Sequence, residues 1–421
     1  MLKTNLSIRY VFLILFISVF VSMLGIGIVA PILPIYAEQN LGASGLWIGF
    51  IFAGFGISRS IITPFVGRLS DEKGRKIFLL IGLLGYTLTG LGYVIATDVV
   101  SLTIIRFANG FTSAMVLPVA QAYIGDITPK GKEGTYMNTF MISLMIGFGV
   151  GPFLGGWMTD VYDAFAAFYS MAALSAFALV LVIIFLPKVG DLLKNPNFAS
   201  EEIRKTHRNK GKASMRRAIK DPYVKGIIIY RTAIGFSRNA LVSFLPIFLV
   251  SSFAATATQV GLVLAVFLLV GAVLQSPMGM LADRVDKIKL ILIGMTFSAT
   301  FIFIMPFIPS LWVLGVVALV ASFFAVAADA PALALGTQVG RKHGMSTVLS
   351  LYDTAIGIGM VGGPLISGLF VDNFGINSMF YLWGIVGIIA VFITYIYLKR
   401  GREFTDLKKT KNEKIIEKRI E

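Results

Sequence analysis

Twelve long apolar stretches limit how this chain can fold more than any other feature of its sequence. Each is about as long as the roughly 20 residues that an α-helix needs to cross a bilayer. A soluble domain could not bury them, because 56% of the 421 residues are hydrophobic and the mean hydropathy is +0.82. We therefore predict an all-α membrane protein with twelve spans. They lie near residues 10–37, 47–66, 77–96, 100–124, 136–159, 165–186, 224–250, 259–279, 289–308, 311–337, 346–370 and 377–398.

Basic residues in the short loops predict the orientation of these spans. If the N-terminus is cytoplasmic, the outer loops carry no Lys or Arg, and this asymmetry is typical of cytoplasmic loops in membrane proteins. We therefore expect a multi-pass protein of the cell membrane with both termini in the cytoplasm. The inner loops carry Arg68, Lys73, Arg75, Lys76, Lys130, Lys132, Arg284, Lys287, Lys289, Arg341 and Lys342.

An internal repeat relates the two halves of the chain. A shift of 212 residues, without a gap, superposes glycines, prolines and aspartates at predicted helix ends and turns. Because six spans separate the copies, both copies have the same orientation, and the axis that relates them lies along the membrane normal. This arrangement of parallel repeats occurs in transporters, with the substrate site between the halves. The matches include Leu33-Pro34 with Leu245-Pro246, Gly49 with Gly261, Asp71 with Asp283, Gly151-Pro152 with Gly363-Pro364, Gly156 with Gly368 and Asp160 with Asp372.

The repeat and the charge pattern divide the chain into four segments. Residues 1–187 form the predicted N-terminal six-helix bundle, and residues 223–400 form the C-terminal one. Residues 188–222 are predicted to be a cytoplasmic basic linker, because ten Lys and Arg lie between Lys188 and Asp221. Residues 401–421 form a similar basic tail. Anionic lipid headgroups are the simplest partner for both basic segments.

Several classes of function are disfavoured by composition. The net charge of +15 could indicate nucleic-acid binding, but the basic residues lie between apolar stretches and not on a soluble domain. There is no cysteine, and both histidines, His207 and His343, lie in basic polar loops. We therefore expect no metal site, no cofactor and no nucleic acid, and the lack of nucleophile or nucleotide motifs predicts that the chain is not an enzyme. A monomer is expected.

Four motifs carry a family resemblance. Residues 67–76 read GRLSDEKGRK, which resembles the signature loop of the major facilitator superfamily, although Asp286 replaces the second glycine in its repeat copy. Residues 147–156 read GFGVGPFLGG and resemble a motif of that superfamily's antiporters. The first and fourth predicted spans are similar to a helix 1 motif and an arginine motif of drug:proton antiporters with twelve spans.

The resemblance implies the major facilitator fold, with two parallel six-helix repeats and transport by alternating access. The motif residues are Gly67, Asp71, Gly74, Arg75, Asp126 and Asp283 of the cytoplasmic gating motif; Gly147, Gly151, Pro152, Gly155 and Gly156 of helix 5; Gly25, Pro31 and Pro34 of helix 1; and Arg106 of helix 4.

Each motif also has a simpler interpretation. Glycines four residues apart let helices approach closely, so Gly147, Gly151 and Gly155 could serve packing alone. In the loop motif we expect a latch, in which Asp71 caps the start of a neighbouring helix and Arg75 pairs with Asp126.

Charged residues inside the spans are the remaining candidates for function. Each is costly if it faces lipid, so it usually faces a cavity or a partner. Asp329 is the first candidate for carrying a proton, because desolvation raises the pKa of a carboxyl group and a nearby arginine lowers it again. The alternative is a permanent Arg–Asp pair that holds the C-terminal half together. The first helix lacks the embedded acid of some drug:proton antiporters. The charged residues are Arg59, Arg106, Arg231, Arg238, Asp329 and Asp353.

Three functional hypotheses follow. The first is proton-coupled efflux of drug-like or amphipathic small molecules, in which the substrate, protons and the lipid membrane are the partners. The second is a metabolite transporter of the same fold, either an exporter of a sugar or peptide-like compound or an importer of an organic anion bound by Arg106 and Arg238. A sensor or membrane scaffold is disfavoured, since no appended signalling domain is visible in the sequence.

Overall fold

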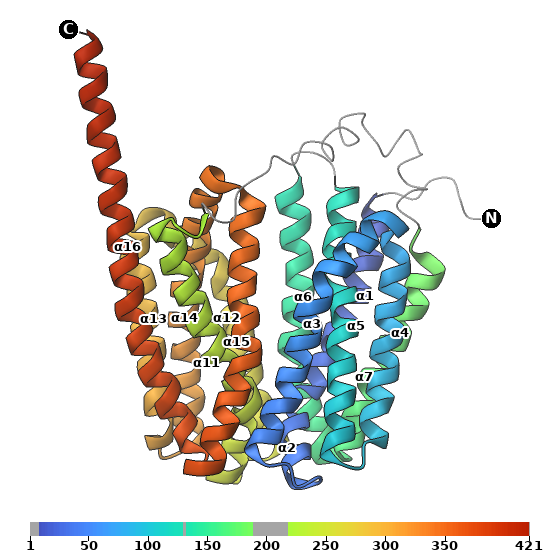
Figure 1. Cartoon of the computed structure of the whole chain (residues 1–421). Coiled ribbons are helices and arrows are strands. Elements are labelled where there is room, and N and C mark those ends of the chain that lie inside the picture. The colour runs from blue at the N-terminus through green and yellow to red at the C-terminus, as the bar shows by residue number, and fades with distance from the viewer. Residues whose placement is uncertain (1–7, 129–131, 188–217, 421) are drawn as a thin grey trace.

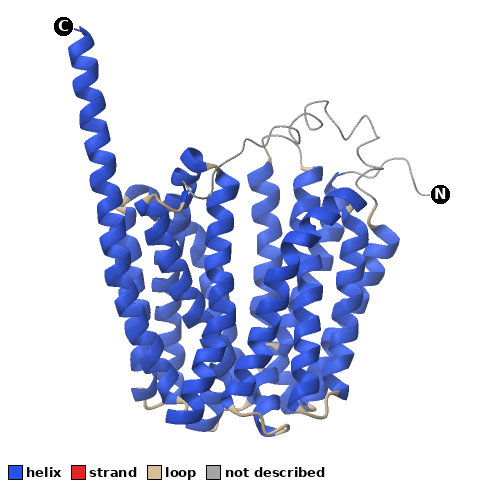
Figure 2. Cartoon of the chain, in the orientation of Figure 1, coloured by secondary structure: helices blue, strands red, loops and turns tan. Residues whose placement is uncertain are grey.

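The computed structural model describes residues 8–128, 132–187 and 218–420, and Figure 2 shows helices joined by short loops through this part of the chain. Twelve helical segments are long and apolar enough to cross a bilayer, which confirms the predicted number of spans. The first half contains α1 (Ile8–Val29), α2 (Ile32–Gln39), α3 (Gly45–Lys73), α4 (Arg75–Ile95), α5 (Val99–Ile127), α6 (Glu133–Val161) and α7 (Ala164–Phe185). The second contains α11 (Pro222–Phe253), α12 (Ala257–Arg284), α13 (Lys287–Ile304), η1 (Met305–Phe307), α14 (Leu311–His343), α15 (Met345–Phe374) and α16 (Asn377–Ile420).

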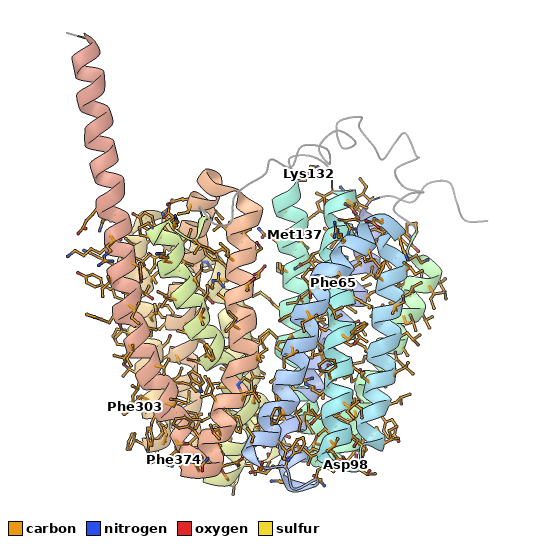
Figure 3. All side chains as sticks on the ribbon, in the orientation of Figure 1. Phe65, Asp98, Lys132, Met137, Phe303 and Phe374 are labelled. Atoms are coloured by element: carbon orange, nitrogen blue, oxygen red, sulfur yellow. The ribbon has the colours of Figure 1, made fainter. Side chains whose placement is uncertain are left out.

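The helices form two bundles that lie side by side (Figure 1). The start of α1 and the end of α16 lie at one end of the bundles, which we call the termini face, and we call the other end the opposite face. In Figure 3, Lys132 lies at the termini face, whereas Asp98 and Phe374 lie at the opposite face. Large apolar side chains such as Phe65, 61% exposed, and Phe392, 65% exposed, cover the outside of the bundles. A bilayer provides an apolar solvent for such a surface.

The first span differs from the single helix predicted near residues 10–37. It runs from Ile8 to Gln39 but consists of α1 and α2, which are separated at residues 30 and 31. Pro31 and Pro34 explain the break, because neither can donate a backbone hydrogen bond and each ring clashes with the preceding turn. The repeat-equivalent helix α11 has Ser243 in place of Pro31 and keeps only Pro246, and it remains continuous.

Short polar side chains start most of the helices. The first backbone N–H groups of a helix have no partner within the helix, and a side-chain oxygen at the preceding residue accepts one or two of them. This explains why seven of the spans begin directly after Ser, Thr or Asp. The capping residues are Ser44 for α3, Asp98 for α5, Asp163 for α7, Asp221 for α11, Thr256 for α12, Asp286 for α13 and Ser310 for α14.

The two halves meet along two pairs of helices, α3 with α15 and α6 with α12. Closest approach occurs toward the opposite face, where a Cβ atom on Gly49 would lie 2.8 Å from the carbonyl oxygen of Pro364. Toward the termini face, a Cβ atom on Gly67 of α3 or Gly279 of α12 would meet no atom within 4 Å. Figure 1 shows the same arrangement, with α6 and α15 lying apart at the termini face. The described conformation is therefore closed at the opposite face.

The C-terminal helix α16 continues past the predicted boundary at residue 400. It spans the bundle and then runs on as one helix to Ile420, so the span and the tail share a single element (Figure 1). The predicted linker at 188–222 falls mainly outside the described residues, which resume at Ala218.

Candidate transport site

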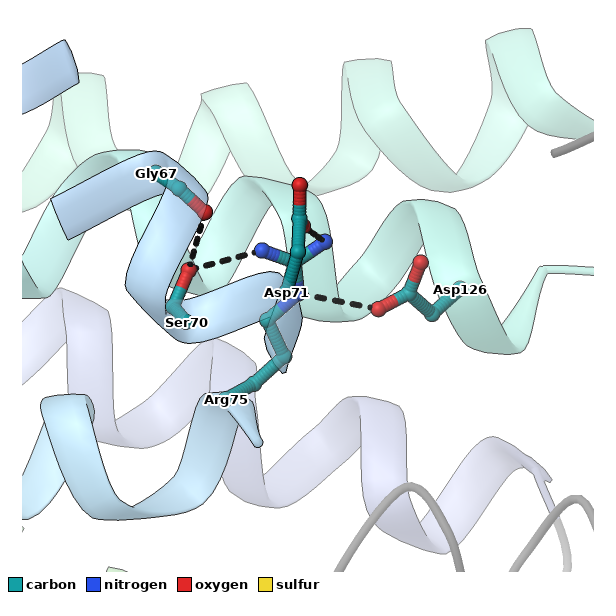
Figure 4. Close-up of polar contacts among 5 residues, drawn as sticks. All are labelled: Gly67, Ser70, Asp71, Arg75 and Asp126. Carbon is teal, nitrogen blue, oxygen red and sulfur yellow. Dashed lines mark hydrogen bonds and ion pairs between the residues drawn. The ribbon is translucent and has the colours of Figure 1, made fainter. Parts of the chain in front are cut away.

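A buried arginine joins three helices of the N-terminal half at the termini face (Figure 4). At the start of α4, Arg75 donates from Nε to Asp126 Oδ2 on α5 over 3.0 Å, and from Nη1 to Ser70 Oγ on α3 over 2.7 Å. A further guanidinium nitrogen pairs with Asp71. The predicted Arg75–Asp126 contact is therefore present. Because Arg75 and Asp126 are only 10% and 17% exposed, these charge-assisted bonds are stronger than ordinary surface pairs.

The predicted role of Asp71 as a helix cap does not match its described contacts. Asp71 remains 57% exposed and pairs with Arg75, so the contact joins the last turn of α3 to the start of α4 across the turn at Gly74. The next helix, α4, has Gly74 as its cap, with no capping side chain. Gly74 has φ +95°, a conformation that favours glycine, and this explains the residue at that position. The Gly67 carbonyl accepts a 2.9 Å bond from Ser70 Oγ.

The repeat-equivalent loop of the C-terminal half has different contacts. Asp286 stands where Gly74 stands in the first half, and it accepts bonds from the backbone N–H groups of Ile288 and Lys289. Its other oxygen pairs with Arg402 of α16 at 2.9 Å. Partial burial raises the pKa of the Asp286 carboxyl, but these bonds outweigh burial, so the pKa lies below its usual range. The side chain of Asp283 is outside the described set.

The helix 5 motif lies at residues 147–156 of α6, the fifth span, and it has two faces. On one face, added Cβ atoms at Gly147, Gly151 and Gly155 would overlap the backbone of α1, so these glycines allow close packing within the N-terminal half. On the other face, Pro152 and Gly156 contact α12 of the opposite half, because a Cβ atom on Gly156 would overlap the backbone of Ala257. The motif thus packs α6 within its own half and also forms part of the contact between the halves.

The helix 1 motif marks a packing site and a break. An added Cβ atom on Gly25 would lie 3.2 Å from Met171 Cα of α7, so a glycine permits this close approach. Pro31 and Pro34 lie where α1 gives way to α2.

Two arginines lie inside the N-terminal half and form no ion pair among the described residues. The Arg106 guanidinium lies over the rings of Phe55 and Phe52, at 4.6 Å and 5.0 Å from their centroids, and donates to Asn109 Oδ1 over 3.2 Å. Such cation–π contacts partly compensate for the loss of water around the charge. Arg59 donates to Ser113 Oγ over 3.0 Å. The N-terminal half therefore contributes positive charge to the interior.

Asp329 lies among polar groups of α11. Its Oδ1 accepts a 2.7 Å bond from the hydroxyl of Tyr230 and lies 3.7 Å from Arg231 Nη1. Tyr230 is 1% exposed, whereas the Asp329 side chain is 29% exposed, so the carboxylate is held from one side and open on another. The arginine beside Asp329 is Arg231, and Arg238 forms no ion pair within the described part of the chain.

Asp353 lies near the boundary between the halves. It lies on α15, within range of electrostatic attraction by Arg231 and by Arg59 of α3. An added Cβ atom on Gly357, one turn further along α15, would lie 3.2 Å from Ser60 Oγ, which confirms that these turns are adjacent. Asp353 is exposed although it lies within a span. Exposed charge at such a position normally faces water between helices, because lipid contact is costly.

Sequence reasoning missed several contacts. The hydroxyl of Tyr230 was not predicted as the partner of Asp329, since nothing in the sequence distinguishes it from other core tyrosines. Asp160 and Asp372 were visible as repeat matches at helix ends, but without a role. Each binds the start of a helix in the opposite half.

Comparison with known proteins identifies the family. The model for the Major Facilitator Superfamily matches residues 15–235 and 227–419, one match for each half. The chain belongs to the major facilitator superfamily. It is thus a multi-pass membrane transporter, and its predicted fold is confirmed.

Individual relatives support the same assignment. An uncharacterized MFS-type transporter of Methanocaldococcus jannaschii is 30% identical over 92% of this chain and 98% of its own. Multidrug resistance protein 1 of Bacillus subtilis is 27% identical over 93% of this chain and 96% of its own. These relatives agree with the predicted resemblance to multidrug efflux members of the superfamily. A bacterial homologue of the human lysosomal transporter Spinster, solved in an inward-facing and unoccupied conformation, has the same fold with a TM-score of 0.77, 15% identity and coverage of 96% and 99% of the two chains.

Proposed function

We propose that this protein exports drug-like or amphipathic small molecules across the cell membrane in exchange for protons. The carboxylate of Asp329, held within a span by Tyr230 and Arg231, is the observation that carries this proposal. A carboxylate inside a span is costly unless it has partners or a function, and its proton affinity depends on how much water and positive charge surround it. Multidrug resistance proteins of Bacillus subtilis, which align over nearly the whole chain, support the choice of substrate.

Proton exchange would follow from alternating access. With both termini in the cytoplasm, the described conformation is open toward the cytoplasm and closed toward the outside. The substrate enters between the halves in this conformation and displaces the proton of Asp329, helped by the adjacent Arg231. When the halves reverse their tilt, the substrate leaves outside and Asp329 takes up a proton there. The cycle needs only two conformations and one titrating carboxylate.

Transport in proteoliposomes tests this function. A gradient of one pH unit supports about tenfold accumulation for each proton exchanged, since one unit is worth about 1.4 kcal/mol. The assay uses vesicles that are acidic inside. Wild-type protein whose cytoplasmic side faces the external medium should then transport a fluorescent hydrophobic cation into the vesicles, where it accumulates. An uncoupler should abolish that accumulation. Equal accumulation with and without the pH gradient would contradict proton coupling, and no uptake of any member of a drug panel would contradict the substrate class.

A second candidate is transport of organic anions. Arg106 and Arg238 form no ion pair among the described residues, so the interior carries positive charge that a substrate carboxylate could neutralise. Counterflow with labelled aromatic carboxylates distinguishes the two candidates. Exchange of carboxylates without exchange of hydrophobic cations would favour the anion transporter.

A further inference from the structure

Two aspartates connect the halves at the opposite face. At the end of α6, the Asp160 carboxylate accepts bonds from the backbone N–H groups of Ala257 and Thr258, over 3.0 Å and 2.7 Å. These groups belong to the first turn of α12, in the other half. We call this contact the first clamp. It holds together two helices of different halves, and Asp160 and Ala257 are 97 residues apart in sequence.

The second clamp is the repeat equivalent of the first. At the end of α15, Asp372 accepts from the backbone N–H groups of Gly45 and Leu46, at the start of α3, over 2.6 Å and 2.8 Å. The 212-residue shift that maps Asp160 onto Asp372 also maps Gly45 and Leu46 onto Ala257 and Thr258. The same carboxylate-to-helix contact is therefore built twice, from four different helices.

Each clamp completes a helix start that its own half leaves unfinished. Ser44 accepts only the N–H of Trp47, the third residue of α3, and Thr256 accepts only that of Gln259, the third residue of α12. The first two N–H groups of each helix are bound by the aspartate from the other half. These groups also carry the positive end of the helix dipole, so a carboxylate is the most favourable partner.

Glycines beside the clamps let the backbones of the two halves come into contact, and the clamps form only in this closed arrangement. A Cβ atom on Gly368 would overlap the backbone of Gly45, and one on Gly156 would overlap that of Ala257. Each glycine lies one turn before the clamp aspartate on the same helix. Because hydrogen bonds weaken steeply beyond about 3.5 Å, even a small separation of the halves at this face breaks all four bonds.

We propose that Asp160 and Asp372 are gate residues, which hold the opposite face closed and are released each time that face opens. The inference rests on the alternating-access cycle proposed above. Both clamps are partly exposed, so on opening, water replaces the N–H partners of each carboxylate. The clamps therefore bias the closed state without locking it. No other polar contact described between the halves has this two-fold repetition.

Distance measurements between spin labels test the gate. The chain has no cysteine, so introduced cysteines are labelled without background. One pair, Thr97→Cys with Pro309→Cys, reports on the opposite face, and a second pair, Leu69→Cys with Leu281→Cys, reports on the termini face. All four positions are exposed, and each pair is related by the 212-residue shift. Labelled protein is studied in lipid nanodiscs without substrate or a proton gradient, so the result does not depend on what is transported.

Asp160→Asn and Asp372→Asn keep the side-chain shape but remove the charge. Each should raise the ratio of open to closed opposite face by about threefold to tenfold, and the double variant by about the product of the two. The termini-face pair should move closer in the same molecules. Asp160→Glu and Asp372→Glu, which keep the charge, should give smaller shifts and serve as a second series if an asparagine variant folds poorly.

Asp163→Asn is the matched control. Asp163 lies three residues after Asp160 at the same face, but it caps α7 of its own half through the N–H of Ala166. Its substitution should leave both distance distributions unchanged. An unchanged opposite-face distance in the Asp160 and Asp372 variants, or an equal shift in Asp163→Asn, would overturn the gate assignment. Failure of wild-type protein to transport any drug-like compound would instead contradict the proposed function, whatever the distances show.

Discussion

The two halves share a scaffold but place their charges differently. In the N-terminal half, Arg75 joins α3, α4 and α5 at the termini face, and the interior arginines have no acid of their own half beside them. In the C-terminal half, the equivalent loop instead ties to α16 through Asp286, and the carboxylates of Asp329 and Asp353 lie within the spans. The aspartates Asp160 and Asp372 are kept in both copies at the ends of α6 and α15, whereas the charged residues of the interior differ between the copies. The latch around Arg75 and the proposed proton carrier Asp329 therefore lie in different halves.

The largest expected effect concerns the shared scaffold. Gly151→Val and its repeat equivalent Gly363→Val should each reduce the yield of folded protein by at least about tenfold, because a side chain would overlap the backbone of the neighbouring helix. Size-exclusion chromatography of detergent extracts measures the yield. Gly315→Val is the control, since a Cβ atom there meets nothing within 4 Å. If only one of the two glycines proves sensitive, the halves do not share the same packing.

The next effect concerns the proton. Asp329→Asn mimics a permanently protonated carboxyl group. Proton-driven accumulation of substrate by this variant should therefore be at least about tenfold lower than in wild type, while downhill exchange of substrate persists. Substrate-induced proton release in detergent, measured from pH 6 to 8, provides the second readout. Normal proton release from this variant would remove Asp329 from the mechanism and point to Asp353.

Arg106 tests whether the N-terminal half contributes to the same step. Arg106→Ala should change the pH dependence of transport, because the positive charge over Phe52 and Phe55 contributes to the field in the interior. Arg106→Lys keeps the charge but loses the planar guanidinium, so it should retain part of the activity. A pH profile of transport distinguishes these outcomes. An unchanged profile in Arg106→Ala would confine proton coupling to the C-terminal half.

A smaller effect is expected at the latch. Arg75→Ala removes the described bonds from Arg75 to Asp126 and Ser70 and should lower the transport rate by about threefold to tenfold, while most of the protein still folds. In the other half, Arg402→Ala breaks an ion pair whose arginine is 56% exposed and should change the rate by less than about twofold. Initial rates in proteoliposomes measure both. If Arg75→Ala and Arg402→Ala lower the transport rate equally, the two loops do not differ in their effect on transport.

The smallest effect is a pH dependence of stability. The pKa of Asp286 is lower in the folded protein than its usual value of about 3.9, so its contacts stabilise the fold above that pH and are lost as the pH falls through the lowered pKa. Asp286→Asn should therefore lower Tm by about 1 °C at pH 7, and the difference should shrink as the pH falls below about 3.9. Thermal unfolding at several pH values measures this. A difference that grows on acidification would contradict the assigned sign.

Much of the fold could be predicted because its signals are local or repeated. Apolar length gives each span, and glycine, proline and aspartate at fixed offsets reveal the repeat. The Arg75–Asp126 pair was predictable from the loop motif together with the topology, which places both residues at the same end of adjacent helices. The contacts of the interior charges could not be predicted in this way. Arg231 and Arg238 lie on the same face of α11, about 10 Å apart along its axis, and only the packing of α14 on α11 decides that Asp329 meets Arg231.

Asp71 shows a second limit of the sequence. A motif states which residues are present but not which of several conformations is populated. In the described conformation, Asp71 pairs with Arg75 of its own half and caps no neighbouring helix start among its described contacts. The break between α1 and α2 differs from this case, because two prolines three residues apart in the sequence are sufficient to explain it.

The duplicated clamps also have a kinetic consequence. A single attachment would let the halves pivot about it, so that one edge of the interface could part while the other stayed closed. Two attachments, one on each helix pair, hold both edges of the interface, so the face opens fully only when both are released. Opening should therefore be a concerted event with a single rate constant, and single-molecule recordings should show abrupt transitions between two distances without a long-lived half-open intermediate. This behaviour would limit leakage of protons through a partly opened interface.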